Sequence, residues 1–158
     1  MDPNEPRAGD IILYPVTPQS SIASRLVAIG ELLLGQGNNQ KEYSHVALLE
    51  KDGYQLEAIF PKIRRSKINP QRPYEIWRID ELTDAQRAIV LNWAYDKLGE
   101  WYNLLYVLSF GLIKIRHEEV CCTYVGDAYA WAGIRFNYTE PDSIANSPKA
   151  RLILEVRP

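Results

Sequence analysis

The chain has very little of what several classes of protein are built from. Its 158 residues include two cysteines and two histidines, and the cysteines are neighbours at positions 121 and 122. Two cysteines make no disulfide framework, and a bridge between adjacent residues closes a strained ring, so we expect thiols. A zinc site formed by Cys121, Cys122, His45 and His117 is disfavoured, because no C-x-x-C spacing is present and adjacent cysteines distort their helix when they bind one tetrahedral ion. We therefore expect no metal.

Long hydrophobic runs and an excess of basic charge are also missing. The longest apolar run, LLYVLSFGLI at residues 104–113, is about half of the ~20 residues that a membrane-spanning helix needs, so we expect no integral membrane segment. The net charge of −2 disfavours a nucleic-acid partner. One stretch, KIRRSKINPQR at residues 62–72, is basic. We interpret it as a solvated loop and strand edge, with a phosphate or anionic-lipid contact as the alternative.

Targeting and cofactor motifs are absent from the sequence as well. The opening MDPNEPRAGD lacks the basic start and apolar run of a secretion signal. The expectation is cytoplasmic synthesis, with delivery to the cell wall left open. No phosphate-binding glycine loop and no dinucleotide fingerprint occur, so we expect no organic cofactor.

What is present has the length and composition of one globular domain, and we expect a single domain over residues 1–158. The Asp52-Gly53 pair between two apolar runs predicts a hairpin, and Thr83 with Gln86 predicts a capping box. Residues 137–150 are interpreted as loop. Strands are predicted around residues 11–14, 45–50, 54–59, 75–79 and 152–156, and helices around residues 21–34, 83–99, 100–115 and 118–133. This pattern predicts an α+β fold in which an antiparallel sheet packs against helices.

The stretch HEEVCCTYVGDAYAWAG puts both cysteines at the start of a predicted helix. Unpaired N–H groups and the positive end of the helix dipole stabilise a thiolate there. The two side chains lie about 100° apart around a helix, so if Cys121 faces a cleft then Cys122 packs inward, or the reverse. The apolar band that follows them is too broad for periodicity to choose between the two.

His45, in YSHVALL, and Glu57, in QLEAIF, fall on the two strands of the predicted hairpin and can share a face. A carboxylate between apolar neighbours is costly without a partner, and His45 is the natural one. Together with a cysteine they follow the logic of a cysteine-hydrolase triad. The alternatives are a hydrogen-bonded core histidine and a solvated glutamate on the outer face. His117 lies just before the cysteine helix and is poorly placed to face the thiol.

Four segments, GDIILY, YSHVALLEKDGYQLEAIF, KLGEWYN and CCTYVGDAY, together resemble the circularly permuted branch of the NlpC-type papain-fold cysteine hydrolases. That branch includes the YiiX/YebB-like proteins and, more distantly, the lecithin retinol acyltransferase group. The resemblance implies a permuted papain-like fold with His45 as base, Glu57 as third catalytic residue and Cys122 as nucleophile, since Cys122 is followed by Thr and, three residues on, by Val. Tyr102 matches a family tyrosine to which we assign no catalytic role. Cys121 and the insert GQGNNQKE depart from the family pattern.

The resemblance implies hydrolysis of amide bonds, with peptidoglycan peptides as the preferred substrates of an amidase or endopeptidase. One alternative is cleavage or transfer of acyl groups on lipids, which the aromatic-rich WYNLLYVLSFGLIKI also suits. Another is a non-catalytic binding module that keeps the fold with an inert cysteine. The sequence leaves the oligomeric state and a host or phage origin open.

Overall fold

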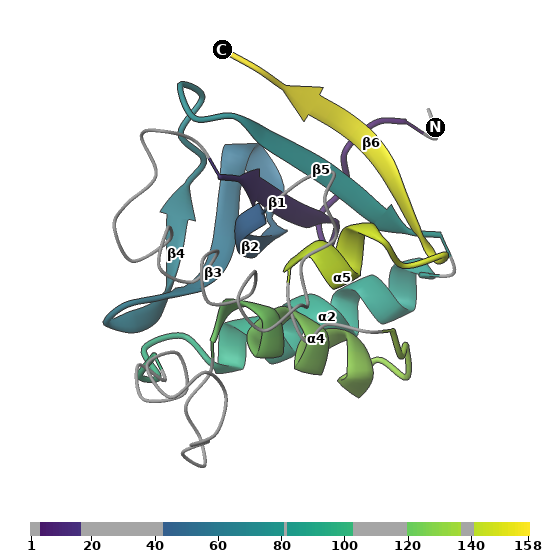
Figure 1. Cartoon of the computed structure of the whole chain (residues 1–158). Coiled ribbons are helices and arrows are strands. Elements are labelled where there is room, and N and C mark those ends of the chain that lie inside the picture. Colours follow the sequence, from purple (N-terminus) through teal and green to yellow (C-terminus); the bar gives the residue numbers. More distant parts are fainter. Residues whose placement is uncertain (1–3, 17–42, 81, 103–119, 137–140) are drawn as a thin grey trace.

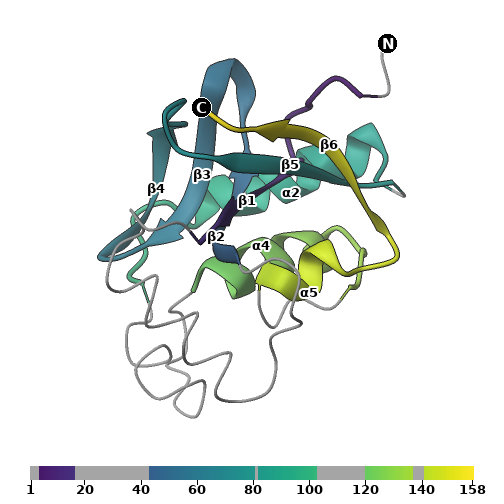
Figure 2. The same ribbon diagram turned by 45° about the horizontal axis from the view of Figure 1, so that its top comes forward.

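The computed structural model describes residues 4–16, 43–80, 82–102, 120–136 and 141–158. Its strands are β1 (Ile11–Pro15), β2 (Tyr43–Leu49), β3 (Tyr54–Ile59), β4 (Lys62–Lys67), β5 (Tyr74–Ile79) and β6 (Ala150–Val156). Its helices are α2 (Asp84–Asp96), α4 (Cys121–Trp131) and α5 (Pro141–Ala145), with a 3-10 turn η1 (Lys51–Gly53). The strands form one antiparallel sheet in the order β4-β3-β2-β1-β5-β6, and the three helices lie on one side of it (Figures 1 and 2). The predicted α+β class is confirmed.

The β2–β3 hairpin forms where the Asp-Gly pair predicts it. Leu48 pairs with Leu56 across the two strands. Asp52 and Gly53 have φ angles of 61° and 75°, in the left-handed region that glycine enters freely and aspartate tolerates. The Glu50 amide closes the turn by donating to the carbonyl of Tyr54 at 2.8 Å. The turn chemistry therefore fixes the register of the two strands that carry the predicted base and carboxylate.

Alternation along the central strands buries both faces of the sheet. Along β1, Ile11 and Leu13 join the core beneath the sheet, whereas Ile12 and Tyr14 join a smaller cluster on the opposite face. Alternate residues of a strand point to opposite faces of the sheet, so β1, which is apolar along its length, packs against a hydrophobic cluster on each face. The core beneath the sheet also contains Val46 and Leu48 of β2, Leu56 and Ala58 of β3, Val90 and Ala94 of α2, and Tyr124, Val125 and Ala128 of α4. Helix α4 is therefore packed directly under β2.

Helix α2 begins with the predicted capping box. The Gln86 amide donates to Oγ1 of Thr83 at 3.3 Å, and the Thr83 amide donates to Oε1 of Gln86 at 3.0 Å. Two of the amides that a helix N-terminus leaves unsatisfied are thus paired. The helix ends at Asp96, and Gly99 follows with a φ of 88°, so the predicted end is late by about one turn.

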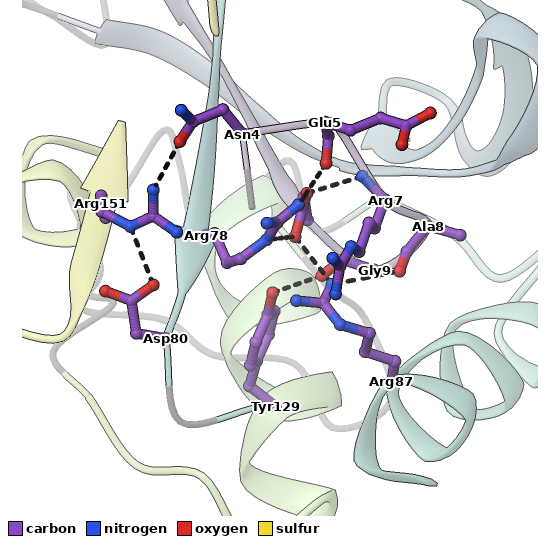
Figure 3. Close-up of polar contacts among 11 residues, drawn as sticks. Asn4, Glu5, Arg7, Ala8, Gly9, Arg78, Asp80, Arg87, Tyr129 and Arg151 are labelled. Atoms are coloured by element: carbon purple, nitrogen blue, oxygen red, sulfur yellow. Dashed lines mark hydrogen bonds and ion pairs between the residues drawn. The ribbon is translucent and has the colours of Figure 1, made fainter. Parts of the chain in front are cut away.

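A buried ionic cluster ties the start of β1 to β5 and α2 (Figure 3). The Asp10 side chain, fully buried, accepts from Nε and Nη2 of Arg78 at 3.1 and 2.7 Å and from Nη1 of Arg87 at 2.7 Å. The hydroxyl of Tyr129, on α4, donates to the carbonyl of Gly9. A buried carboxylate needs such partners, because burial without them costs about 3 kcal/mol or more. The Gly-Asp pair that opens β1 is thus the point at which strand and helices are joined.

The structure differs from the sequence-based expectation at three elements. Strand β4 forms where the sequence favours a loop and strand edge, α5 forms where it favours a loop, and β6 begins at Ala150 rather than near residue 152. Trp101, placed in a predicted helix, forms a β-bridge with Lys62. The helix predicted at 21–34 and residues 103–115 of the next helix lie outside the described residues. In the part of the chain that the structure describes, no helix is both long and apolar enough to cross a membrane.

Candidate active site

His45 and Glu57 meet on one face of the β2–β3 hairpin. Continued from the Leu48–Leu56 pair, the register puts Glu57 opposite Ala47, two residues from His45 and on the same side of the ladder. Nε2 of His45 lies 2.8 Å from Oε2 of Glu57. The side chains are 9% and 4% exposed. The predicted pairing of these two residues is therefore present, and it is buried.

The second oxygen of Glu57 is held by strand β4. Oε1 accepts from Oγ of Ser66 at 2.7 Å and from Nε of Arg64 at 3.1 Å. Burial raises the pKa of Glu57, but the hydrogen bond and charge of His45, followed by Ser66 and Arg64, lower it to about 2. The carboxylate is consequently ionised at neutral pH and fixed at both oxygens. Part of the basic stretch at residues 62–72 thus supports the site, a role that the sequence did not suggest.

Cys121 is the first residue of α4 and lies against β2. The helix is capped by the residues beside it, since the Val120 amide donates to Oγ1 of Thr123 at 3.0 Å. The Cys121 thiol accepts a hydrogen bond from the backbone of Val46 and is hydrogen-bonded to the His45 side chain. Packing of α4 under β2 therefore brings together two residues that are far apart in the sequence.

The electrostatics of Cys121 and His45 favour a thiolate beside an imidazolium. The neighbouring Cys122 thiol, then the hydrogen bond and charge of His45 and the Val46 backbone, lower the pKa of Cys121 well below that of an ordinary thiol, against burial, which raises it. Burial lowers the pKa of His45, but hydrogen bonds to Cys121 and Glu57 outweigh it and raise the pKa to about 9. Each residue thus stabilises the charged form of the other.

The structure brings Cys121 to His45, whereas the sequence motif had selected Cys122. Cys122 is 5% exposed and belongs to the hydrophobic core beneath the sheet. Its sulfur lies 3.9 Å from that of Cys121. Adjacent helical residues point in directions about 100° apart, so the turn that aims Cys121 at β2 directs Cys122 into the core. The structure therefore places Cys121 beside His45 and the predicted nucleophile, Cys122, in the adjoining core.

Tyr14 lies against His45, a contact that the sequence does not predict. It is paired with His45 in the β1–β2 ladder, and the two rings are stacked with centroids 5.7 Å apart and planes at 28°. Its hydroxyl donates to Oε1 of Gln55, and Nε2 of Gln55 donates to Ser66 at 3.2 Å. The only signal in the sequence was one tyrosine in the otherwise aliphatic strand IILYP.

Tyr102, the family tyrosine, is packed against the same core. Its amide donates to the carbonyl of Pro61 at 2.9 Å. Burial first, and then the charges of Cys121 and Cys122, raise the pKa of its hydroxyl. The hydroxyl is thus protonated and near the two thiols. His117 lies outside the described residues.

The described residues do not fit a metal centre. Over the ranges described, no three His, Cys, Asp or Glu side chains gather as a ligand set. Zinc in proteins takes three or four such ligands. The chemistry that this arrangement supports directly is that of an activated thiol and an oriented imidazole.

Comparison with known proteins gives a fold but no family. No protein-family model matches the chain, and no curated protein matches it. The chain is similar to the crystal structure of metalloprotein YiiX from Escherichia coli O157:H7, with a TM-score of 0.65 and 17% identity over 97% of this chain and 99% of that chain. Similarity over almost the full length of both chains, at this identity, shows that the chain shares the fold of YiiX.

Proposed function

We propose that the chain is a cysteine hydrolase with a permuted papain-like fold of the NlpC type, that it cleaves amide bonds, and that its substrates are peptidoglycan peptides. The observation that carries the proposal is the chain of contacts from Cys121 to His45 to Glu57. A nucleophile, a base and a group that orients the base are the three parts of such a site. The order His, Glu, Cys along the chain agrees with a permuted topology, and the shared fold with YiiX agrees with the YiiX/YebB-like branch.

The proposed reaction begins at the Cys121 thiolate. It attacks the amide carbonyl carbon, and His45 donates its proton to the leaving nitrogen as the C–N bond breaks. Water then attacks the thioester while His45 accepts a proton, which releases the acid and restores the thiolate. Because Nε2 of His45 is hydrogen-bonded to Glu57, the transferred proton moves through Nδ1. Glu57 is therefore a positioning residue that also stabilises the imidazolium.

The start of α4 supplies donors for the oxyanion in this mechanism. Cys121 is the first residue of the helix, and the first amides of a helix have no partner within the helix. Donors aimed at a developing oxyanion contribute ~3 kcal/mol each in other acyl-transfer enzymes. YiiX is described as a metalloprotein. The proposed mechanism contains no metal-dependent step, because the described residues of this chain offer no metal-ligand set.

The test is digestion of purified peptidoglycan fragments, followed by mass spectrometry of the products. We expect amide cleavage by the wild type, loss of ~10³-fold or more in Cys121→Ala, and retained cleavage in the matched variant Cys122→Ala. Cleavage that survives Cys121→Ala and is lost in Cys122→Ala would restore the sequence-based assignment. Release of fatty acid from acyl lipids in place of peptide cleavage would favour the lipid-acting alternative. Binding of either substrate without turnover would favour the binding module.

A further inference from the structure

Arg72 lies beside the site without taking part in its hydrogen-bonded chain. It follows a turn in the β4–β5 loop, where its amide donates to the carbonyl of Asn69 at 3.2 Å. Its guanidinium carbon lies 4.1 Å from the centroid of the Tyr14 ring. Nη2 also donates to Oγ of Ser44, next to His45, at a long 3.5 Å. The side chain is thus held over the ring that stacks on His45.

This guanidinium has no carboxylate partner among the residues that the structure describes. The other arginines near the site are paired, Arg64 with Glu57 and Arg65 with Glu50. Arg72 is half-buried, and burial lowers its pKa because the charged form loses water there. Ring stacking and one long hydrogen bond leave most of its five N–H donors for another group. A half-buried guanidinium in this state is suited to an anion that comes from outside.

We propose that Arg72 binds a carboxylate of the substrate and so selects peptides that carry a free carboxylate close to the scissile amide. The inference rests on the proposed function, since it concerns the substrate of the Cys121–His45 pair. A guanidinium matches a carboxylate in a bidentate geometry. The carboxylate would replace the water that Arg72 has lost.

Distances along the site limit how far that carboxylate can be from the reacting carbonyl. The guanidinium is 4.1 Å from the Tyr14 centroid, and that centroid is 5.7 Å from the centroid of His45. The guanidinium is therefore at most about 10 Å from the imidazole. An extended peptide covers ~3.3–3.6 Å per residue, so the span holds no more than about three residues. The geometry thus points to a carboxylate, at the end of the chain or on a side chain, within about three residues of the part of the substrate that contacts His45.

Thiol-directed probes of graded length test this without a known substrate. N-bromoacetyl-glycine and N-bromoacetyl-glycylglycine alkylate a thiolate by forming a C–S bond as bromide leaves, and each has a neutral carboxamide counterpart. We expect wild-type Cys121 to react ~10-fold or more faster with the carboxylates, the range of one charge-assisted hydrogen bond or more. In Arg72→Gln the carboxylate and carboxamide rates should converge.

Two control variants separate a bound carboxylate from general attraction. Lys67→Gln removes one exposed positive charge from the end of β4 and should keep the preference for carboxylates. Arg72→Lys keeps the positive charge but lacks the bidentate fork of the guanidinium, and should keep part of the preference for carboxylates. A preference that is the same in Arg72→Gln as in the wild type, or one that Lys67→Gln lowers equally, overturns the assignment.

A second measurement tests carboxylate binding at Arg72 without relying on the reactivity of the Cys121 thiol. If Cys121 reacts no faster than an ordinary thiol, the proposed function fails, but carboxylate binding is still measurable. We would titrate the Cys121→Ala protein with N-acetyl-glycylglycine and with its carboxamide, and follow the shifts by NMR. Binding of the carboxylate alone, lost when Arg72→Gln is added, supports the Arg72 site. Equal binding of both compounds, or of neither, overturns it.

Discussion

The carboxylate of Glu57 is clamped between two strands, with one oxygen 2.8 Å from Nε2 of His45 on β2 and the other bonded to Ser66 and Arg64 on β4. This arrangement means that His45 cannot rotate away from its carboxylate without breaking a buried charge-assisted hydrogen bond. Such bonds are worth ~1.5–3 kcal/mol. The imidazole is therefore oriented before any substrate arrives.

The pH dependence of thiol alkylation should show a reactive Cys121 already in acid and a second change in rate near pH 9. The pKa of Cys121 is lowered well below its ordinary value, so its thiolate persists into acid. The pKa of His45 is raised to about 9, so the imidazolium that stabilises this thiolate is lost only as the pH rises through that value. Iodoacetamide labelling, localised by peptide mass spectrometry, checks this. A Cys121 rate that rises only near pH 8.5, as for a free thiol, would contradict the ion pair.

Substitution of Glu57→Gln should lower activity and move the alkaline limb of the pH profile. The glutamine keeps the shape but loses the charge that raises the pKa of His45. We expect a loss of roughly 10²- to 10⁴-fold in kcat/KM and an alkaline limb at lower pH. The matched control is Glu50→Gln, since Glu50 pairs with Arg65. An unchanged alkaline limb in Glu57→Gln would show that Glu57 does not tune the base.

Glu57 should also make the protein sensitive to acid. Its pKa falls from 4.5 in the unfolded chain to about 2 in the folded one. The stability that this shift provides is present above pH 4.5 and is lost as the pH falls through about 2. From the linkage between protonation and folding, the stability contributed by this pKa shift is on the order of 3 kcal/mol. Urea unfolding between pH 6 and pH 2 measures it, and the Glu57→Gln variant should show a flatter acid limb. Parallel curves for the two proteins would refute this source of acid lability.

Asp10 and Asp80 offer a comparison of a buried with an exposed ion pair. Asp10→Asn leaves the charges of Arg78 and Arg87 uncompensated in the interior and should lower the free energy of unfolding by about 3–5 kcal/mol. Asp80→Asn breaks a pair with Arg151 in which both side chains are at least 40% exposed, and should cost less than ~1 kcal/mol. Urea titration of both variants at pH 7 provides the measurement. Equal decreases in the free energy of unfolding would mean that the ion pairs of Asp10 do not stabilise the start of β1 more than an exposed pair does.

The sequence predicted the parts of the site that depend on local rules. The Asp-Gly turn sets the register of β2 and β3, and that register puts His45 and Glu57 on the same face of the hairpin. The capping box of α2 likewise depends on residues only three apart. Short apolar runs also predicted the central strands, because buried strands are rich in apolar residues.

Elements that depend on tertiary contacts were harder to predict. Strand β4 reads KIRRSK, with Ile63 the one buried residue in an edge strand that is otherwise partly or fully exposed, and charge is common on such edges. Which of Cys121 and Cys122 lies beside His45 also depends on a tertiary contact. Both residues precede a broad apolar band on the helix, so only the direction from which β2 approaches α4 separates them. A motif match to the residue types after Cys122 could not supply that direction.

The strand order carries a consequence for how the thiol becomes reactive. The base and its carboxylate belong to one hairpin of neighbouring strands, which needs only short loop closure, whereas Cys121 joins them through packing of α4 under β2. Local hairpins form in ~1–10 μs, and contacts between distant segments come later. An incompletely folded chain therefore has an ordinary thiol at position 121, and nucleophilicity is acquired only when the last layer docks. Under the proposed function, the protein is therefore inactive during its own synthesis, and the reactivity of Cys121 reports completed folding.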